Sequence, residues 1–143
     1  MNPISRPSDR PRRKKKTVET PEVHVQELAA LGELMLGAAW ADGDKHAVEI
    51  VAIAEQLKEF VDTPELPPFV SERMERFDPA TFDVAESCKG LRFESDEDRL
   101  SVLKLLARIA GADRHLHPAE MAYLKRFATA AGLDPESIRV ELV

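Results

Sequence analysis

The chain has 143 residues, 43% of them hydrophobic, which fits one ordinary globular domain. Its net charge of −6 is unevenly distributed. Residues 1–16 carry seven Lys or Arg and one Asp, whereas residues 17–143 carry 13 Lys or Arg and 25 Asp or Glu. The body of the chain is therefore acidic. Because phosphate binding requires clustered cations, we expect no nucleic-acid partner, and the acidic body favours cations or basic partners instead.

The basic charge lies in residues 1–19, where prolines and the run PRRKKK at residues 11–16 predict a disordered tail. Two roles are open for this tail: a solubilising spacer, or a segment that docks electrostatically to an anionic membrane surface or to nucleic acid. Each basic residue near anionic lipid contributes about 1 kcal/mol, which is enough for weak contact in total. Residues 20–143 form the predicted folded domain.

The sequence excludes several kinds of protein. The single cysteine, Cys88, excludes an intramolecular disulfide and a cysteine-based zinc cage, and we predict that its thiol is buried and structural. No apolar segment follows the basic start, as a signal peptide would require. The longest apolar stretch, near residues 34–41, is shorter than the ~20 residues of a membrane-spanning helix. We therefore expect a cytoplasmic protein that contacts the inner membrane face at most through its tail.

The first half of the domain reads as four helices. Thr20 is a candidate N-cap with Pro21 at the first helical position, and apolar residues recur at three- or four-residue intervals until about residue 42. A second helix is predicted from about residue 46 to 61. Prolines then interrupt the chain, and short helices are expected near residues 67–77 and 79–89.

The second half reads as two long helices and a short one. Ser95 is the predicted N-cap of a long helix with an acidic first turn. The next helix is predicted over residues 118–131, with Gly132 as its C-cap, and Asp134 opens a short last helix. No segment alternates apolar and polar residues as a half-buried strand does, so the predicted fold class is all-α.

Two segments repeat at a separation of 71 residues: AWADGDKHAVE at 39–49 and AGADRHLHPAE at 110–120. Five of eleven positions are identical, and apolar positions on both sides also correspond. Each copy consists of an apolar helix, an Ala-Asp turn, a histidine, a glutamate and a second apolar helix. The pattern predicts two related helical hairpins, whose packing about a pseudo-twofold axis would bring the equivalent turns into related positions.

The repeated acidic residues have two interpretations. In the first, Glu49 and Glu120 are helix-capping residues, each three positions after a histidine, and the aspartates bond turn amides. In the second they form a cation site, because carboxylates on turns suit Ca²⁺ or Mg²⁺. The spacing is not that of an EF-hand. The predicted metal ligands are Asp42, Asp44, Glu49, Asp113 and Glu120.

The two turns also contain histidines, which are ligands for other metal ions. In addition, the second turn differs from the first at one position that affects cation binding. His46, His115 and His117 lie on the two turns, so Zn²⁺ or Ni²⁺ is the second choice of metal. Arg114 replaces the glycine of the first copy and would repel a cation there. We therefore expect the first turn to bind a metal more tightly than the second.

These motifs resemble the TerB-like family. The segment ADGDKHAVE at 41–49 matches the family signature, ADRHLHPAE at 112–120 matches its Asp and Glu, and LKRFATAAGLDPESI at 124–138 resembles the end of that domain. The resemblance implies an all-α bundle of about seven helices and a link to tellurite resistance or wider stress. It also implies acidic metal-binding positions, carried here by Asp42, Glu49, Asp113 and Glu120; Asp44 is added on chemical grounds alone.

The expected function is a stress-response module that binds a divalent cation through its acidic turns and acts through protein partners. The alternative is a metal-free interaction adaptor that uses its acidic face. An enzyme is not expected, because the sequence has no nucleophile–base motif, no glycine-rich phosphate loop and no HExxH helix. For the same reason no small-molecule substrate is expected.

Overall fold

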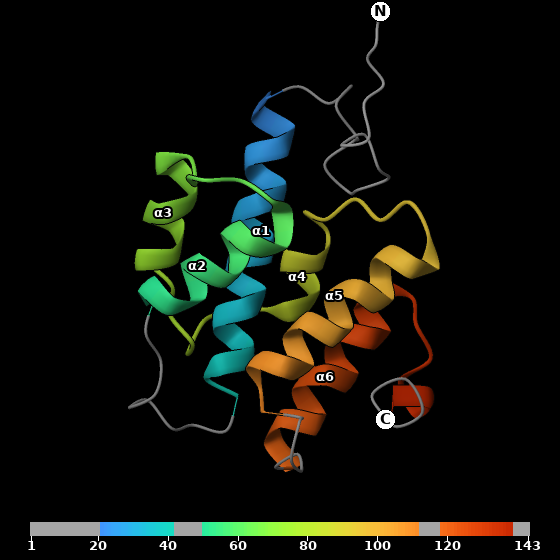
Figure 1. Cartoon of the computed structure of the whole chain (residues 1–143). Coiled ribbons are helices and arrows are strands. Elements are labelled where there is room, and N and C mark those ends of the chain that lie inside the picture. The colour runs from blue at the N-terminus through green and yellow to red at the C-terminus, as the bar shows by residue number, and fades with distance from the viewer. Residues whose placement is uncertain (1–20, 42–49, 112–117, 139–143) are drawn as a thin grey trace, which may run out of the picture.

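A computed structural model of the chain describes residues 21–41, 50–111 and 118–138, and these residues form a helical bundle without strands (Figure 1). The all-α prediction is confirmed. Over the described residues there are six α-helices and one 3-10 helix: α1 (Pro21–Ala39), α2 (Ile50–Val61), α3 (Pro68–Glu75), α4 (Val84–Cys88), α5 (Asp96–Ile109), α6 (Pro118–Ala131) and η4 (Pro135–Ser137). The last of the roughly seven expected helices is thus a three-residue 3-10 turn.

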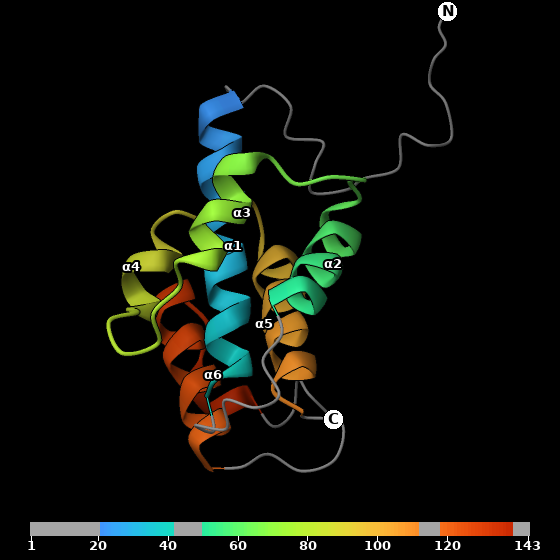
Figure 2. The same ribbon diagram turned by 90° about the vertical axis from the view of Figure 1, so that its left-hand side faces the viewer.

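Helix α1 is the centre of the bundle. It contacts each of the other five α-helices, and Figures 1 and 2 show it running between them. The sequence pattern predicted an apolar stripe, but buried side chains surround much of this helix: Leu28, Ala29, Ala30, Leu31, Leu34, Met35, Leu36 and Ala38. A helix that is apolar on all sides is stable only when neighbours cover every side, which explains its central place.

Two glycines let neighbouring side chains approach α1 closely. A Cβ atom at Gly37 would overlap the hydroxyl of Tyr123 and lie 2.9 Å from Cε2 of Phe82. A Cβ atom at Gly32 would lie 2.9 Å from the sulfur of Met74. Interiors are packed as densely as organic crystals, so the missing side chains here are part of the fit between α1 and its neighbours.

An ion pair joins α1 to α3 on the surface side of their contact. The guanidinium of Arg73 donates to Glu33 from Nη2 at 2.7 Å and from Nε at 3.2 Å, and this bidentate hydrogen bonding raises the pKa of Arg73. The Arg73 side chain also lies over the ring of Phe69, 5.5 Å from its centroid. The planar guanidinium is suited to both contacts at once.

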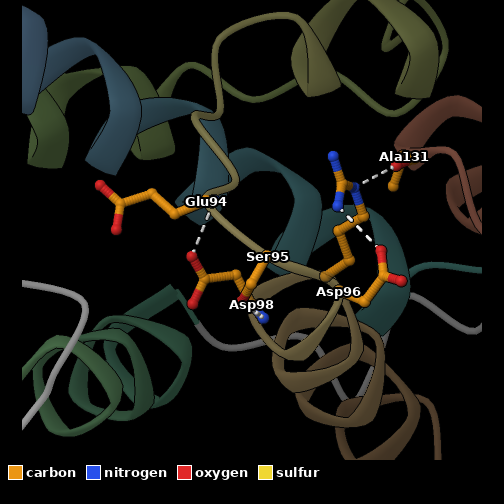
Figure 3. Close-up of polar contacts among 6 residues, drawn as sticks. Glu94, Ser95, Asp96, Asp98 and Ala131 are labelled. Atoms are coloured by element: carbon orange, nitrogen blue, oxygen red, sulfur yellow. Dashed lines mark hydrogen bonds and ion pairs between the residues drawn. The ribbon is translucent and has the colours of Figure 1, made fainter.

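The predicted start of α5 is confirmed in detail (Figure 3). The Ser95 hydroxyl accepts a hydrogen bond from the amide of Asp98 at 3.2 Å, and the Asp98 carboxylate accepts one from the amide of Glu94 at 2.9 Å. Nε of Arg99 donates to the carbonyl of Ala131 at 2.8 Å. Local caps therefore begin the helix, and one arginine ties its first turns to the end of α6.

Other helix ends are also close to their predicted positions. Helix α6 covers the predicted residues 118–131, and Gly132 has the positive φ of 89° expected after a helix C-terminus. The two short helices are shorter than predicted. The second begins only at Val84, because the Asp83 carboxylate accepts hydrogen bonds from two amides of the following turn and so caps the helix there. The predicted cap Thr20 and the predicted start of α2 near residue 46 lie outside the described residues.

The thiol of Cys88 lies in the interior of the bundle. Cys88 is only 6% exposed, as predicted, and burial raises the pKa of its thiol to about 11. Such a thiol stays protonated at neutral pH.

None of the helices in the described part of the chain combines the length and the apolar character that a membrane-crossing helix needs. The predicted tail at residues 1–19 lies outside the described residues.

Candidate functional site

The helices that carry the two repeated motifs converge at one end of the bundle. Helices α1 and α5 end there and α6 begins there, as both views show (Figures 1 and 2). The turn residues Trp40 and Ala41 follow α1, while Ala110 and Gly111 follow α5. Gly111 has a φ of 91°, which is suited to glycine. The helix ends on which the two acidic turns begin are thus neighbours in space.

The predicted metal ligands themselves are mostly beyond the described segments. Asp42, Asp44, Glu49 and Asp113 lie outside the described residues. Glu120 is in the first turn of α6 and partly buried, a position that suits either a helix-capping role or a ligand at the turn. Among the residues that the structure describes, no group of three His, Cys, Asp or Glu side chains could hold a metal ion. The metal site therefore stays a prediction.

Beside this end of the bundle the structure shows an open groove that the sequence did not predict. It has a volume of about 910 Å³ and lies between the end of α1, the segment joining α3 to α4, and the outer side of α6. Gly37, Trp40, Phe82 and Tyr123 are among the residues that line it. Phe82 also packs on Phe77, with ring centroids 5.1 Å apart. The groove therefore has an aromatic lining assembled from three separate parts of the chain.

Tyr123 links the groove to the core. Its ring is 3% exposed, and its hydroxyl donates a hydrogen bond to the carbonyl oxygen of Leu34 at 2.7 Å. Burial raises the pKa of Tyr123 far above the ordinary value, so the phenol stays neutral and keeps this donor. Because the bond joins α6 to α1, it fixes one wall of the groove relative to the other.

Two cations of α6, Lys125 and Arg126, lie at the rim of the groove. The guanidinium of Arg126 is 5.7 Å from the centroid of the Tyr123 ring. Within the described part of the chain, neither cation forms an ion pair with a carboxylate. Asp83 and Glu136 also line the groove, but the Asp83 carboxylate already accepts two hydrogen bonds as the cap of α4.

Sequence reasoning could not have identified this groove from local patterns. The adjacent cations at 125 and 126 read as ordinary exposed residues of a helix, and Trp40 as a core residue near a turn. The only local signal was a basic pair in a domain that is otherwise strongly acidic. The groove exists because the α3–α4 segment and α6 flank the same end of α1.

In a comparison with family models, residues 25–141 match a family described as Tellurite resistance protein TerB. The matched range starts within α1 and includes every later helix and η4. The resemblance drawn from the repeated motifs is therefore confirmed. No curated protein and no solved structure matches the chain.

Proposed function

The chain belongs to the TerB family of tellurite resistance proteins, and from this premise we propose that it is a non-enzymatic stress-response module. In this proposal it binds one divalent cation through its acidic turns and acts through protein partners. Family membership supports a tellurite-resistance-type role. The identity of the ion and of the partners belongs to the proposal.

The observation that carries the cation half of the proposal is the convergence of the two hairpins. The ends of α1 and α5 and the start of α6 lie at one end of the bundle, and the repeated carboxylates follow those helix ends in the sequence (Figures 1 and 2). The ligands would be Asp42, Asp44 and Glu49 at the first turn, with Asp113 and Glu120 at the second. Such a set of hard oxygen donors suits Ca²⁺ or Mg²⁺ before Zn²⁺ or Ni²⁺.

A bound cation would supply positive charge where carboxylates repel one another. Neutralising that repulsion would hold the turns in a defined arrangement and couple metal binding to the stability of the domain. The surface offered to a protein partner at this end of the bundle would then depend on the ion. This is how a module without catalytic residues can respond to a change in metal concentration.

The alternative is a metal-free adaptor that uses its acidic face. It is favoured by the charge distribution, because residues 17–143 carry 25 acidic and 13 basic residues and so attract basic partners.

Weak contact between the basic tail and the inner membrane face is compatible with either role. Deleting residues 1–19 should abolish sedimentation with anionic liposomes at low salt, and unchanged sedimentation would exclude that contact.

The test is a titration of the folded protein with Ca²⁺, Mg²⁺, Zn²⁺ and Ni²⁺, followed by heat and by the fluorescence of Trp40, the only tryptophan. The variant Asp42→Ala/Asp113→Ala removes one carboxylate from each turn. Glu72→Ala/Glu75→Ala is a matched control, because both residues are exposed on α3 and away from the turns. Saturable binding that only the first variant loses would support the metal-binding module. No binding by folded wild type would leave the metal-free adaptor.

A further inference from the structure

The groove beside α6 has the character of a binding surface for another molecule. Phe77 and Phe82 form its wall on the α3–α4 side, Trp40 and Tyr123 line it from α1 and α6, and its volume is about 910 Å³. Trp40, Phe77 and Phe82 are partly exposed there, whereas Tyr123 is buried beneath them. Partly exposed aromatic residues contribute large contact areas at low entropic cost, and they are enriched at the centres of protein interfaces. The groove is open on its outer side, so a peptide can lie along it.

The charged side chains around the groove indicate what kind of ligand would bind in it. Lys125 and Arg126 stand at the rim without a carboxylate partner in the described part of the chain, although the domain is acidic as a whole. A carboxylate placed beside them would form charge-assisted hydrogen bonds, which are stronger than neutral ones. The carboxylate of Asp83 across the groove is engaged by the amides of Ala85 at 2.9 Å and Glu86 at 3.2 Å.

We propose that this groove docks a short, mostly apolar peptide segment of a partner protein, with one or two carboxylates directed at Lys125 and Arg126. The apolar side chains of the segment contact the aromatic lining, and the carboxylates fix its direction along α6. This proposal rests on the partner-binding half of the proposed function and names the surface and the partner chemistry for it.

The same charges limit how acidic the segment can be. The body of the domain has a net charge of −12, so a run of acidic residues is repelled at long range even though the rim attracts it locally. Glu136 at the η4 side of the groove adds to this repulsion. The preferred segment therefore carries few carboxylates among apolar residues, rather than a polyacidic tail.

The test begins with a phage-displayed library of random short peptides, selected on the full-length protein in EDTA. We expect the selected pool to be enriched in aromatic or aliphatic residues next to a single Asp or Glu. A fluorescein-labelled synthetic peptide from that pool then provides a dissociation constant by anisotropy. The selection is repeated with Ca²⁺ and Mg²⁺ in place of EDTA. Binding in EDTA shows that the groove works without the metal, and a failure under both conditions is distinguishable from a failure of the metal titration.

Matched variants locate the binding site. Lys125→Glu/Arg126→Glu should weaken the labelled peptide about tenfold or more, because it replaces attraction with repulsion. Lys104→Glu/Arg108→Glu changes the charge equally at exposed positions of α5 that do not line the groove, and it should leave affinity unchanged. A peptide with Lys in place of its acidic residue should regain binding to the first variant.

A steric variant keeps the test decisive if charge reversal disturbs folding. Ala130 is exposed and lines the groove, so Ala130→Trp should fill it and abolish binding while circular dichroism shows intact helices. Selection of basic peptides, no enrichment, or equal affinity for the groove and control variants would overturn the proposal. Basic peptides would instead favour the acidic-face adaptor.

Discussion

Helices α1 and α6 approach closely where Gly37 lies against Tyr123. In Gly37→Ala the new methyl group would overlap the Tyr123 hydroxyl and lie 2.9 Å from Cε2 of Phe82. The ring cannot simply turn away, because it is 3% exposed and its hydroxyl is bonded to Leu34 at 2.7 Å. Tyr123 must therefore shift toward the groove and weaken that hydrogen bond.

The expected cost follows from three terms. Inserting a methylene-sized group into a well-packed core costs about 1–3 kcal/mol. Weakening the bond to Leu34 costs about 1 kcal/mol more. In the opposite direction, alanine has a higher helix propensity than glycine, which stabilises the helix by about 1 kcal/mol. The net expectation is a loss of about 1–3 kcal/mol in the free energy of unfolding, or roughly 3 °C in Tm per kcal/mol for a domain of this size.

The assay is urea unfolding of a double-mutant cycle. Tyr123→Phe alone should cost about 1 kcal/mol through its lost hydrogen bond. It also removes the oxygen that the new methyl group at position 37 would meet, so the double variant should be less destabilised than the sum of the single variants, by about 1 kcal/mol. Gly32→Ala is the matched control, because the flexible thioether of Met74 can move aside. Strict additivity, or a Gly37→Ala protein as stable as wild type, would refute the reasoning.

Three further predictions concern other parts of the bundle. Burial raises the pKa of the Cys88 thiol from 9.0 to about 11, so alkylation at pH 8 should be about 100-fold slower in native than in urea-unfolded protein. The unfolded chain loses this proton first, so stability should fall between pH 9 and pH 11, and Cys88→Ala should flatten that fall. Glu33→Gln should lower the free energy of urea unfolding by about 1 kcal/mol through loss of the partly exposed pair with Arg73; no change would show that the pair is energetically neutral. Ser95→Ala should lower the thermal midpoint by a loss of about 1 kcal/mol, whereas Ser101→Ala, exposed within α5, should not.

Most of the helices were predictable because their signals are local. The N-cap Ser95 and the start of α6 at Pro118 follow from short-range hydrogen bonding and proline geometry, and both are observed. The bounds of α4 were less predictable. Only the two hydrogen bonds to the Asp83 carboxylate decide where it begins, and several polar residues nearby could have served as the cap.

The candidate site also has one part that the sequence predicts and one part that it does not. The repeated acidic motifs are sequence properties and predicted the family, which the match over residues 25–141 confirms. Their role as metal ligands stays a prediction, with only Glu120 among the described residues. The groove was not predictable, because its lining comes from α1, the α3–α4 segment and α6, which are far apart in the chain.

The amino-acid sequence by itself determined the helical class, the caps that start helices, the acidic body and the two repeated turns, since each depends on residues within a few positions of one another. Only the tertiary structure decided that α1 is surrounded by the other helices and that Gly37 lies against Tyr123. It also brought Lys125 and Arg126 to the rim of an aromatic groove. Those features depend on which apolar faces meet, and close packing across long sequence separations decides that.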